Sequence, residues 1–440
     1  MAKAKFVTPI EENTMKSNNS NRREFIKHSI KTGAVISSLS GAMSVSSYSR
    51  IIGANDTVRI GMIGTGGRNR WHVGWLDRVS SVEKLSVVAG CDIWSENRGH
   101  GANEIKKRFD NEPKMFKNYH ELLAQPDIDA VCIATPDHQH CTMLIDAVKA
   151  GKDAYVEKPI GMELDNLNDA ADAVKSSDRI VQNGSQGRSS AGAAAAKEFM
   201  QSGKLGKLLR VEESRSHYIP YWNHYPKPKQ ESDTDWQAFL FNRPYRPFNA
   251  DQHASWMGYR DFSSGTVGGW MSHLSDFIHY LTDCGFPQTA TSQGGIYATT
   301  SEPQRTCTDT VTAILSYAEG FTTLFTTHFG NAYNDYTIFF CEKGTMVVND
   351  PDGNTGGIKP RILGDGSDHA EKIKNAIELD NTTEEDHMTN WIRCIKSRKQ
   401  PNAHMGYGYM QGVACILADR AYEEGCNMKF DDAKREIIPA

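Results

Sequence analysis

Lys158 is the residue best placed for chemistry in this chain of 440 residues. It follows a short apolar stretch that predicts a buried strand. An ammonium group at the end of such a strand can hold a substrate oxygen and stabilise the negative charge that develops on it. Glu-Lys-Pro by itself is also common in surface turns, so the role of Lys158 depends on its neighbours. The run around it is Tyr155-Val156-Glu157-Lys158-Pro159-Ile160-Gly161.

A second candidate cluster lies on a predicted helix, in the order His273, Asp276, His279. The spacing of three residues places His273 and Asp276 on one face of that helix. Histidine titrates near neutral pH and suits general-base catalysis, although a buried core histidine is the ordinary alternative. Successive steps of three drift around a helix and no fourth ligand is evident, so we predict no metal.

A glycine-rich turn precedes Lys158 by one βαβ unit. Residues Val58 to Ile63 predict a strand, and Arg70 to Val79 predict the helix that follows. In a dinucleotide site the first glycine permits a tight turn, and the second lets backbone N–H groups approach a pyrophosphate at the helix N-terminus. Asn69 occupies the third glycine position, so the motif is incomplete and also fits any tight turn. The turn reads Gly64-Thr65-Gly66-Gly67-Arg68.

Two further predicted strands end in polar residues. Leu85 to Cys91 ends in Asp92, and Ala130 to Ala134 ends in Thr135-Pro136, with His140 shortly after it. Strands of this length that alternate with helices predict an α/β fold with a doubly wound parallel sheet, a Rossmann domain. Ligands of such sheets bind at the carboxyl ends of the strands, where these residues and Lys158 should meet.

Asp92 bears on the choice of cofactor. A carboxylate at the end of the second strand can accept hydrogen bonds from the adenosine ribose and would repel a 2′-phosphate, which favours NAD over NADP. NADP remains possible because Arg68 and Arg98 could serve a phosphate. A loop aspartate that caps the next helix is the alternative for Asp92.

These motifs resemble the glucose-fructose oxidoreductase, inositol dehydrogenase and rhizopine catabolism family, written Gfo/Idh/MocA. The resemblance covers roughly residues 55 to 440 and is specific to the family, though not to a substrate. Besides the segments above it rests on Gln182-Asn183-Gly184-Ser185-Gln186, Gly265-Thr266-Val267-Gly268-Gly269 with His273 and Asp276, and Ile395-Lys396-Ser397-Arg398-Lys399-Gln400-Pro401-Asn402.

The resemblance implies site residues and domains. His273 falls on the family's catalytic histidine, but the usual aspartate four residues earlier is Gly269, which puts a Lys-Asp-His triad in doubt. Lys158 and His273 then remain, with Asp276 as a supporting acid. The implied domains are a Rossmann domain at 55–180 and an α+β substrate domain with an open, mainly antiparallel sheet at 181–440. The implied cofactor-binding residues are Gly64, Gly66, Gly67, Arg68, Asp92, Thr135, Pro136, His140, Glu157 and Lys158.

The second domain contains an aromatic-rich segment, residues 217–262. Aromatic faces stack on sugar rings, and Arg or His beside them can bond hydroxyl groups. A long loop held by its own aromatic residues, or a subunit interface, explains the segment equally well. The candidates for a carbohydrate pocket are Trp222, Tyr245, Arg246, Trp256 and Tyr259, with Tyr218, Tyr221, Trp236 and Arg260 beside them.

The N-terminal 50 residues predict a leader. Asn21-Arg22-Arg23-Glu24-Phe25-Ile26-Lys27 precedes a mildly apolar stretch and resembles a twin-arginine export signal, with a disordered basic tail as the alternative. The resemblance implies the twin-arginine translocase as a partner and a periplasmic or exported location. Such signals suit enzymes that fold around a cofactor before export.

Composition narrows the classes of function. The net charge of −5 gives no electrostatic case for nucleic acid, and no apolar stretch is long enough to span a bilayer. The nine cysteines include no Cys-x-x-Cys pair and read as core residues. We also expect a homo-oligomer through the C-terminal sheet.

The sequence therefore predicts an exported, NAD-dependent oxidoreductase that acts on a sugar, sugar derivative or cyclic polyol by hydride transfer. Two alternatives remain. The first is a redox-neutral, NAD-dependent glycosidase or lyase of the same family, and the second is a non-catalytic protein that binds a nucleotide and a sugar.

Overall fold

The computed structural model describes residues 56–224, 226–298, 304–333, 335–349, 359–367, 371–380 and 385–440. The predicted export signal around Arg22-Arg23 lies outside these residues. Within them, no helix has the length and apolarity needed to cross a membrane. All nine cysteines are free thiols, and only Cys426 is exposed.

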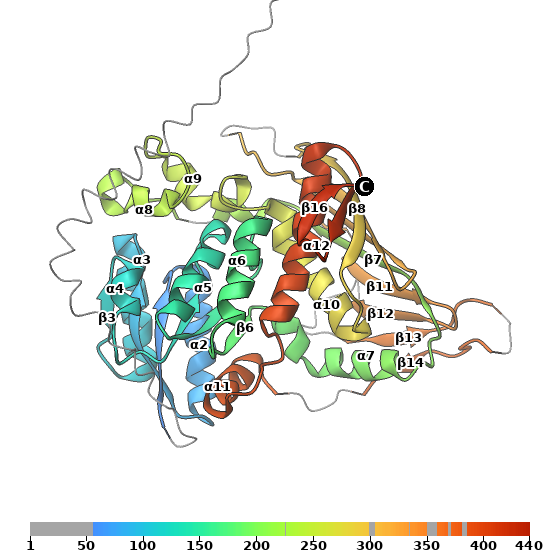
Figure 1. Cartoon of the computed structure of the whole chain (residues 1–440), viewed down its shortest axis with the longest axis horizontal. Helices are drawn as coiled ribbons and strands as arrows, with labels where there is room; N and C mark the ends of the chain where they lie inside the picture. Colours follow the sequence, from blue (N-terminus) through green and yellow to red (C-terminus); the bar gives the residue numbers. More distant parts are fainter. Residues whose placement is uncertain are drawn as a thin grey trace, which may run out of the picture. The chain divides into compact units, whose positions relative to one another are not determined.

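The first sheet is parallel and six-stranded, with the order β3-β2-β1-β4-β5-β6 (Figure 1). This confirms the predicted Rossmann fold, and the predicted bounds of the first two strands match. The strands are β1 (Val58–Ile63), β2 (Leu85–Cys91), β3 (Lys114–Phe116), β4 (Ala130–Ile133), β5 (Asp153–Val156) and β6 (Val181–Asn183). The helices between them are α2 (Gly67–Ser80), α3 (Ser95–Phe109), α4 (Tyr119–Leu123), α5 (His140–Lys149) and α6 (Leu164–Lys175).

Both faces of this sheet are covered, which explains why its strands are apolar throughout. Alternate residues of β4 point to opposite faces. Ala130 and Cys132 belong to the cluster that includes Leu76 of α2, whereas Val131 and Ile133 belong to the cluster that includes Leu144 of α5. The strand ends at one edge are therefore held between two packed layers of helices.

The Rossmann sheet also uses chain beyond residue 180, the predicted end of the domain. Its sixth strand is β6, and helix α11 (His387–Ser397) packs against α2 with Trp391 fully buried. The C-terminal part of the chain thus returns to cover one face of the first sheet.

The second sheet has ten strands in the order β14-β13-β12-β11-β7-β10-β9-β8-β15-β16. Only the β7–β10 pair is parallel among its described pairs, so the sheet is mainly antiparallel, as predicted. The strands are β7 (Leu208–His217), β8 (Pro287–Gly295), β9 (Thr310–Tyr317), β10 (Thr322–Phe329), β11 (Tyr336–Cys341), β12 (Thr345–Asn349), β13 (Arg361–Leu363), β14 (Ile377–Glu378), β15 (Met428–Asp431) and β16 (Glu436–Pro439).

Three helices pack together along this sheet: α7 (Ala191–Gln201), α10 (Ser272–Thr282) and α12 (Met405–Glu424) (Figure 1). Burial alternates along β10, so one face of the sheet is covered and the other is partly exposed. A single π-helical turn, η6 (Val267–Met271), leads directly into α10. This turn sets where the first residues of α10, including His273, lie.

Candidate active site

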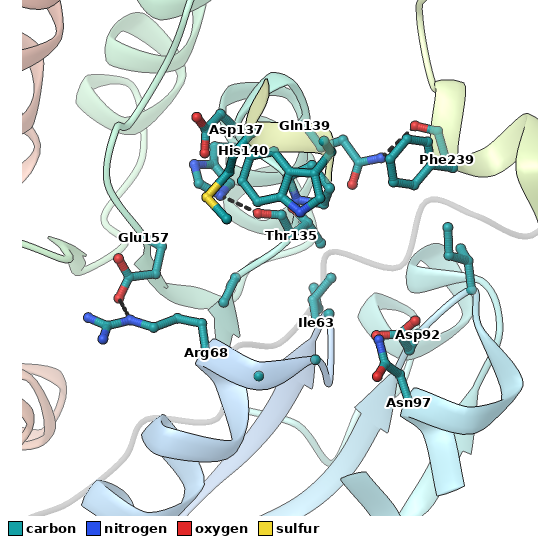
Figure 2. A pocket seen from close by; sticks show the side chains of 18 of the residues that line it. Ile63, Arg68, Asp92, Asn97, Thr135, Asp137, Gln139, His140, Glu157 and Phe239 are labelled. Carbon is teal, nitrogen blue, oxygen red and sulfur yellow. Dashed lines mark hydrogen bonds and ion pairs between the residues drawn. The ribbon is translucent and has the colours of Figure 1, made fainter. Parts of the chain in front are cut away.

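A cavity of about 1380 Å³ lies at the carboxyl ends of the Rossmann strands. All ten predicted cofactor-binding residues line it, and so does His273 from α10. Figure 2 labels five of the ten: Arg68, Asp92, Thr135, His140 and Glu157. The structure therefore brings the glycine turn, the strand-end residues and the predicted general base together in one space. The size suits a dinucleotide with a small substrate beside it.

The glycine turn fits a pyrophosphate. Gly64 has a φ of +82°, and a Cβ there would come within 2.9 Å of the Ala134 carbonyl oxygen, so only glycine is accommodated. Helix α2 begins at Gly67 and has no side-chain cap, so its first N–H groups remain for a ligand at the cavity edge.

Asp92 lies at the end of β2, buried at the cavity wall. Its Oδ1 accepts the Trp94 N–H at 2.9 Å, just before helix α3, whose first turn has no side-chain cap. Burial raises its pKa to about 6, against the hydrogen bond from Trp94 and the charge of Arg98. The carboxylate lies beside Asn97 at the cavity wall (Figure 2).

Glu157 accepts hydrogen bonds from several segments that form the cavity wall. Its buried carboxylate accepts hydrogen bonds from Arg68 Nε at 2.6 Å, His72 Nε2 at 2.8 Å and Gln186 Nε2 at 3.1 Å, and from the backbone N–H of Lys158 at 3.1 Å. Burial raises its pKa, but the His72 hydrogen bond and the Arg68 charge outweigh burial and hold the pKa well below its ordinary value. We call these residues the Glu157 cluster.

Lys158 follows β5 and is half-buried in the cavity wall. Its Nζ donates to the Gly269 carbonyl oxygen at 2.7 Å, which links the Rossmann strand to the π-helical turn. Burial lowers its pKa, while the charges of Glu157 and Asp137 act in the opposite direction. A lysine in this setting can move its ammonium from a backbone oxygen to a substrate oxygen.

His273 is half-buried and lines the cavity from the first turn of α10. Burial lowers its pKa well below the ordinary value, and the charge of Lys158 lowers it further. The imidazole is therefore neutral at pH 7 and able to accept a proton.

Asp276 does not reach the cavity. It is buried one turn further along α10 and pairs with Arg188, whose Nε lies 2.8 Å from Oδ1. Tyr407 stacks on the same guanidinium, with 3.7 Å from Cζ to the ring centroid. Asp276 thus fixes α10 rather than facing the space beside His273. His279 is fully buried, and the described residues contain no group of His, Cys, Asp and Glu that could hold a metal ion.

Most of the aromatic-rich segment forms a compact unit with a core of its own. Residues 231–262, which we call the aromatic lobe, pack around their own core and around Ile93. Short helices α8 (Trp236–Leu240) and α9 (Ala250–Ala254) form its frame. The alternative of a loop held by its own aromatic residues therefore describes most of it. Its core residues are Trp236, Phe239, Leu240, Tyr259 and Phe262.

The aromatic lobe is bonded to the loops that follow β2 and β4. Asp235 N–H donates to the Ile93 carbonyl at 3.2 Å, and the Phe239 carbonyl accepts from Gln139 Nε2 at 3.1 Å. Lys117 and Asp235 form an ion pair of 2.9 Å. The lobe thereby forms a wall of the cavity on the side of Asp92.

The predicted carbohydrate residues are separated by the fold. Of the five, only Trp256 lines the cavity. Trp222 is fully buried in the core, and Tyr245 is 71% exposed on the surface. Arg246 pairs with Asp261, and Tyr259 donates to Asp251, both away from the cavity lining.

Several polar residues of the cavity wall are absent from the predicted site, among them Asn97, Asp137, Gln186 and His217. Asp137 directly follows Thr135-Pro136 at the end of β4, so its position in the sequence was a usable signal. Ser263 Oγ donates to it at 2.7 Å, and burial raises its pKa to about 6. Gln186 acts through Glu157, a contact that no local pattern indicates.

Comparison with protein families agrees with this geometry. Residues 58–185 match the oxidoreductase family with an NAD-binding Rossmann fold, Gfo/Idh/MocA, and residues 238–347 match the C-terminal domain of the same family. The chain carries both domains of the Gfo/Idh/MocA family. The first of them is an NAD-binding domain, which agrees with the predicted cofactor.

Relatives of this Gfo/Idh/MocA chain include proteins named as glycosidases. Glycosyl hydrolase family 109 protein 2 of Shewanella sp. strain ANA-3 is 26% identical over 288 residues, which cover 60% of this chain and 59% of that protein. The α-N-acetylgalactosaminidase of Shewanella oneidensis is 28% identical over 171 residues, covering 37% of this chain and 36% of that protein. These alignments span less than two thirds of either relative.

Among solved structures, levoglucosan dehydrogenase in complex with NADH superposes with a TM-score of 0.63 and 18% identity. The superposition covers 87% of this chain and 99% of that one. At this identity the similarity shows a shared fold.

Asp92 should set the preference for NAD. Replacing it by alanine removes an ionised acceptor for the ribose, so Asp92→Ala should weaken NAD binding by about 10-fold or more, the order expected for a charged hydrogen bond. The preference over NADP should narrow in Asp92→Ala and in the isosteric Asp92→Asn. Calorimetric titration with both nucleotides measures the effect. Tighter binding of NADP than of NAD by the wild type would contradict the assignment.

The Glu157 cluster should dominate local stability. Glu157→Gln leaves Arg68 and His72 without their anion, so the free energy of unfolding at pH 7 should fall on the order of 3 kcal/mol. The folded-state pKa of Glu157 lies well below the ordinary value of 4.5. Its contribution to the free energy of unfolding is therefore complete above pH 4.5 and is lost gradually as the pH falls from 4.5 through the folded-state pKa. Denaturant unfolding at pH 7 and pH 4 measures the difference.

The matched control for that experiment is Glu112→Gln, because Glu112 is 76% exposed and pairs with Lys106 at the surface. Its effect should be near zero. An equal, small loss in both variants would show that the Glu157 cluster contributes little to stability.

Proposed function

We propose that this Gfo/Idh/MocA chain is an NAD-dependent oxidoreductase that acts on CH–OH groups of a sugar, sugar derivative or cyclic polyol by hydride transfer. The observation that carries the proposal is the position of Lys158 and His273. They come from different domains and line the same cavity as the glycine turn and Asp92.

Each of these residues has a separate role in the proposed reaction. NAD, when bound, supplies the hydride acceptor for the carbon-bound hydrogen of the substrate. The neutral His273 imidazole accepts the proton of the substrate hydroxyl, and Lys158 Nζ holds the same oxygen while negative charge develops on it. The Glu157 cluster fixes the backbone of Lys158 during these steps.

A carbohydrate substrate is supported by the aromatic surface near these two residues. Tyr221, Trp256 and Trp270 line the cavity, together with His217. Their rings offer apolar faces to a sugar, and the polar groups around them can bond hydroxyls. Levoglucosan dehydrogenase, which shares the fold, is named for a sugar substrate.

A second candidate function is a redox-neutral glycosidase or lyase. In it a substrate hydroxyl is oxidised transiently to a ketone, with the hydride held on NAD, and the ketone acidifies the adjacent C–H so that the glycosidic bond is eliminated to give an enone. In a glycosidase water then adds to the enone, whereas in a lyase it does not, and the held hydride reduces the ketone again. Similarity to proteins named glycosyl hydrolase family 109 and α-N-acetylgalactosaminidase favours it. The aromatic lobe also favours it, because a wall bonded to the loops after β2 and β4 would retain the cofactor between turnovers.

A non-catalytic binding protein is the least supported alternative, because it gives no reason for Lys158 and His273 to face one cavity. We further propose export through the twin-arginine translocase and a homo-oligomer through the partly exposed face of the second sheet. Export is supported by the Arg22-Arg23 motif, and the homo-oligomer is supported by the alternating burial of β10.

The test uses the full chain purified with its bound cofactor. It is incubated, without free NAD, with D-glucose, myo-inositol, levoglucosan and p-nitrophenyl α-N-acetylgalactosaminide. A dehydrogenase gives a single stoichiometric rise in absorbance at about 340 nm, the band of reduced nicotinamide, with one of the first three. A redox-neutral glycosidase releases p-nitrophenol continuously with no net reduction.

Lys158→Ala should lower the rate of nicotinamide reduction, or of p-nitrophenol release, by roughly 100-fold, the order expected for one electrostatic group. NADH binding should be retained. Lys175→Ala, a change at an exposed lysine, is the control and should behave as the wild type. Near-normal turnover in Lys158→Ala would contradict the role of Lys158.

A further inference from the structure

Tyr221 reaches the cavity from the segment that follows β7. It begins the short helix η3 (Tyr221–His224), and its ring packs against three aromatic neighbours. The ring centroids lie 5.3 Å from Trp222, 5.3 Å from Trp270 and 5.6 Å from Phe329. This packing fixes the ring, so the hydroxyl has a defined place in the cavity wall.

The hydroxyl of Tyr221 lies against the residue that Lys158 contacts. A Cβ added to Gly269 would overlap Tyr221 Oη, and the next nearest atom is Tyr221 Cζ at 3.3 Å. The Gly269 carbonyl oxygen accepts Lys158 Nζ at 2.7 Å. Tyr221 and Lys158 therefore meet on one glycine, and Tyr221 Oη occupies the space that any side chain at position 269 would need.

The turn that carries Gly269 is shaped to permit this contact. It is π-helical, a form that is frequent at functional sites, and it leads into helix α10, whose second residue is His273. Tyr221 Oη donates to the Gly265 carbonyl oxygen at 3.1 Å, just before the same turn. A phenol has one hydrogen-bond donor, and its hydroxyl hydrogen can rotate. Tyr221 Oη can therefore turn from the Gly265 carbonyl to donate to a substrate oxygen, as Lys158 Nζ can turn from the Gly269 carbonyl.

We propose that Tyr221 is a third catalytic group, whose hydroxyl binds the reacting oxygen of the substrate together with Lys158 and His273. The proposal rests on the proposed function and deepens it, because three polar groups around one oxygen fix the position of the carbon that carries the transferred hydrogen. The proposal also explains why position 269 is a glycine. A residue with a side chain at that position would displace Tyr221 Oη.

The first test is Tyr221→Phe in the full chain with its cofactor bound, on the most active member of the same substrate panel. The substitution keeps the ring and its packing and removes only Oη. The value of kcat/KM should fall about 10-fold to 100-fold, while NADH affinity, measured by fluorescence, is unchanged. Tyr333→Phe, a change at a tyrosine that is 73% exposed and does not line the cavity, is the control.

A merely structural tyrosine gives a different result. If Tyr221 serves only to anchor Gly265, Tyr221→Phe lowers Tm and leaves kcat/KM at the wild-type value, which would overturn the proposal. Failure of the wild type itself to react with any panel member would instead refute the proposed function, and a catalytic Tyr221 with it.

The second test asks whether Tyr221 Oη fills the space beside Gly269, and it uses stability rather than activity as the readout. Gly269→Ala should lower Tm in the wild type, because its Cβ overlaps Tyr221 Oη. In the Tyr221→Phe background the atom nearest to the new Cβ is ring atom Cζ at 3.3 Å. The decrease in Tm caused by Gly269→Ala should therefore be much smaller there than in the wild type. Activity of the double variant should remain as low as in Tyr221→Phe. Equal losses of Tm in both backgrounds would show that Oη does not fill this space.

Discussion

The buried carboxylate of Glu157 is the interaction on which the arrangement of this site depends. A carboxylate is stable in a protein interior only when it is paired and hydrogen-bonded. Here the partners are Arg68 and His72 from α2, Gln186 from the start of the second domain, and the backbone of Lys158. Satisfying one charge therefore fixes the helix behind the glycine turn relative to the strand that carries the lysine.

From that anchor the site extends in two directions. Toward the first domain, the fixed helix α2 presents its uncapped N-terminus beside Gly64 and Gly66, and the aromatic lobe closes the wall near Asp92. Toward the second domain, Lys158 bonds the Gly269 carbonyl and so fixes the π-helical turn before His273. Cofactor and substrate parts of the cavity are thus joined through adjacent residues of one chain segment, Glu157 and Lys158.

Local patterns predicted the Rossmann domain well because its signals are local. The strands Val58–Ile63 and Leu85–Cys91 are apolar runs with turn residues at both ends, and each ends where predicted. The cofactor residues followed, because parallel strands bring their carboxyl ends to one edge. The antiparallel strands Thr310–Tyr317 and Tyr336–Cys341 also carry a local signal, because buried residues alternate with less buried ones along each strand.

Contacts between distant segments could not be predicted. Asp276 has the spacing of a second site residue, but it pairs with Arg188, 88 positions away. Trp222 and Tyr245 are both aromatic, yet one is fully buried and the other 71% exposed, because packing between distant segments decides which rings are covered. Tyr221 was a weak candidate in the sequence, and its contact with Gly269 depends on two segments whose proximity only the fold creates.

The central claim is that Lys158 and His273 direct hydride transfer from a sugar carbon to the nicotinamide in this cavity. The most direct measurement follows an isotope. The cofactor-bound protein is incubated with a reactive sugar that carries deuterium on its CH–OH carbons, and the reduced nucleotide is trapped by rapid quenching and analysed by mass spectrometry. The account predicts one deuterium on the nicotinamide ring in the wild type and little in Lys158→Ala. Conversion of the sugar with no deuterium in the quenched cofactor would contradict it.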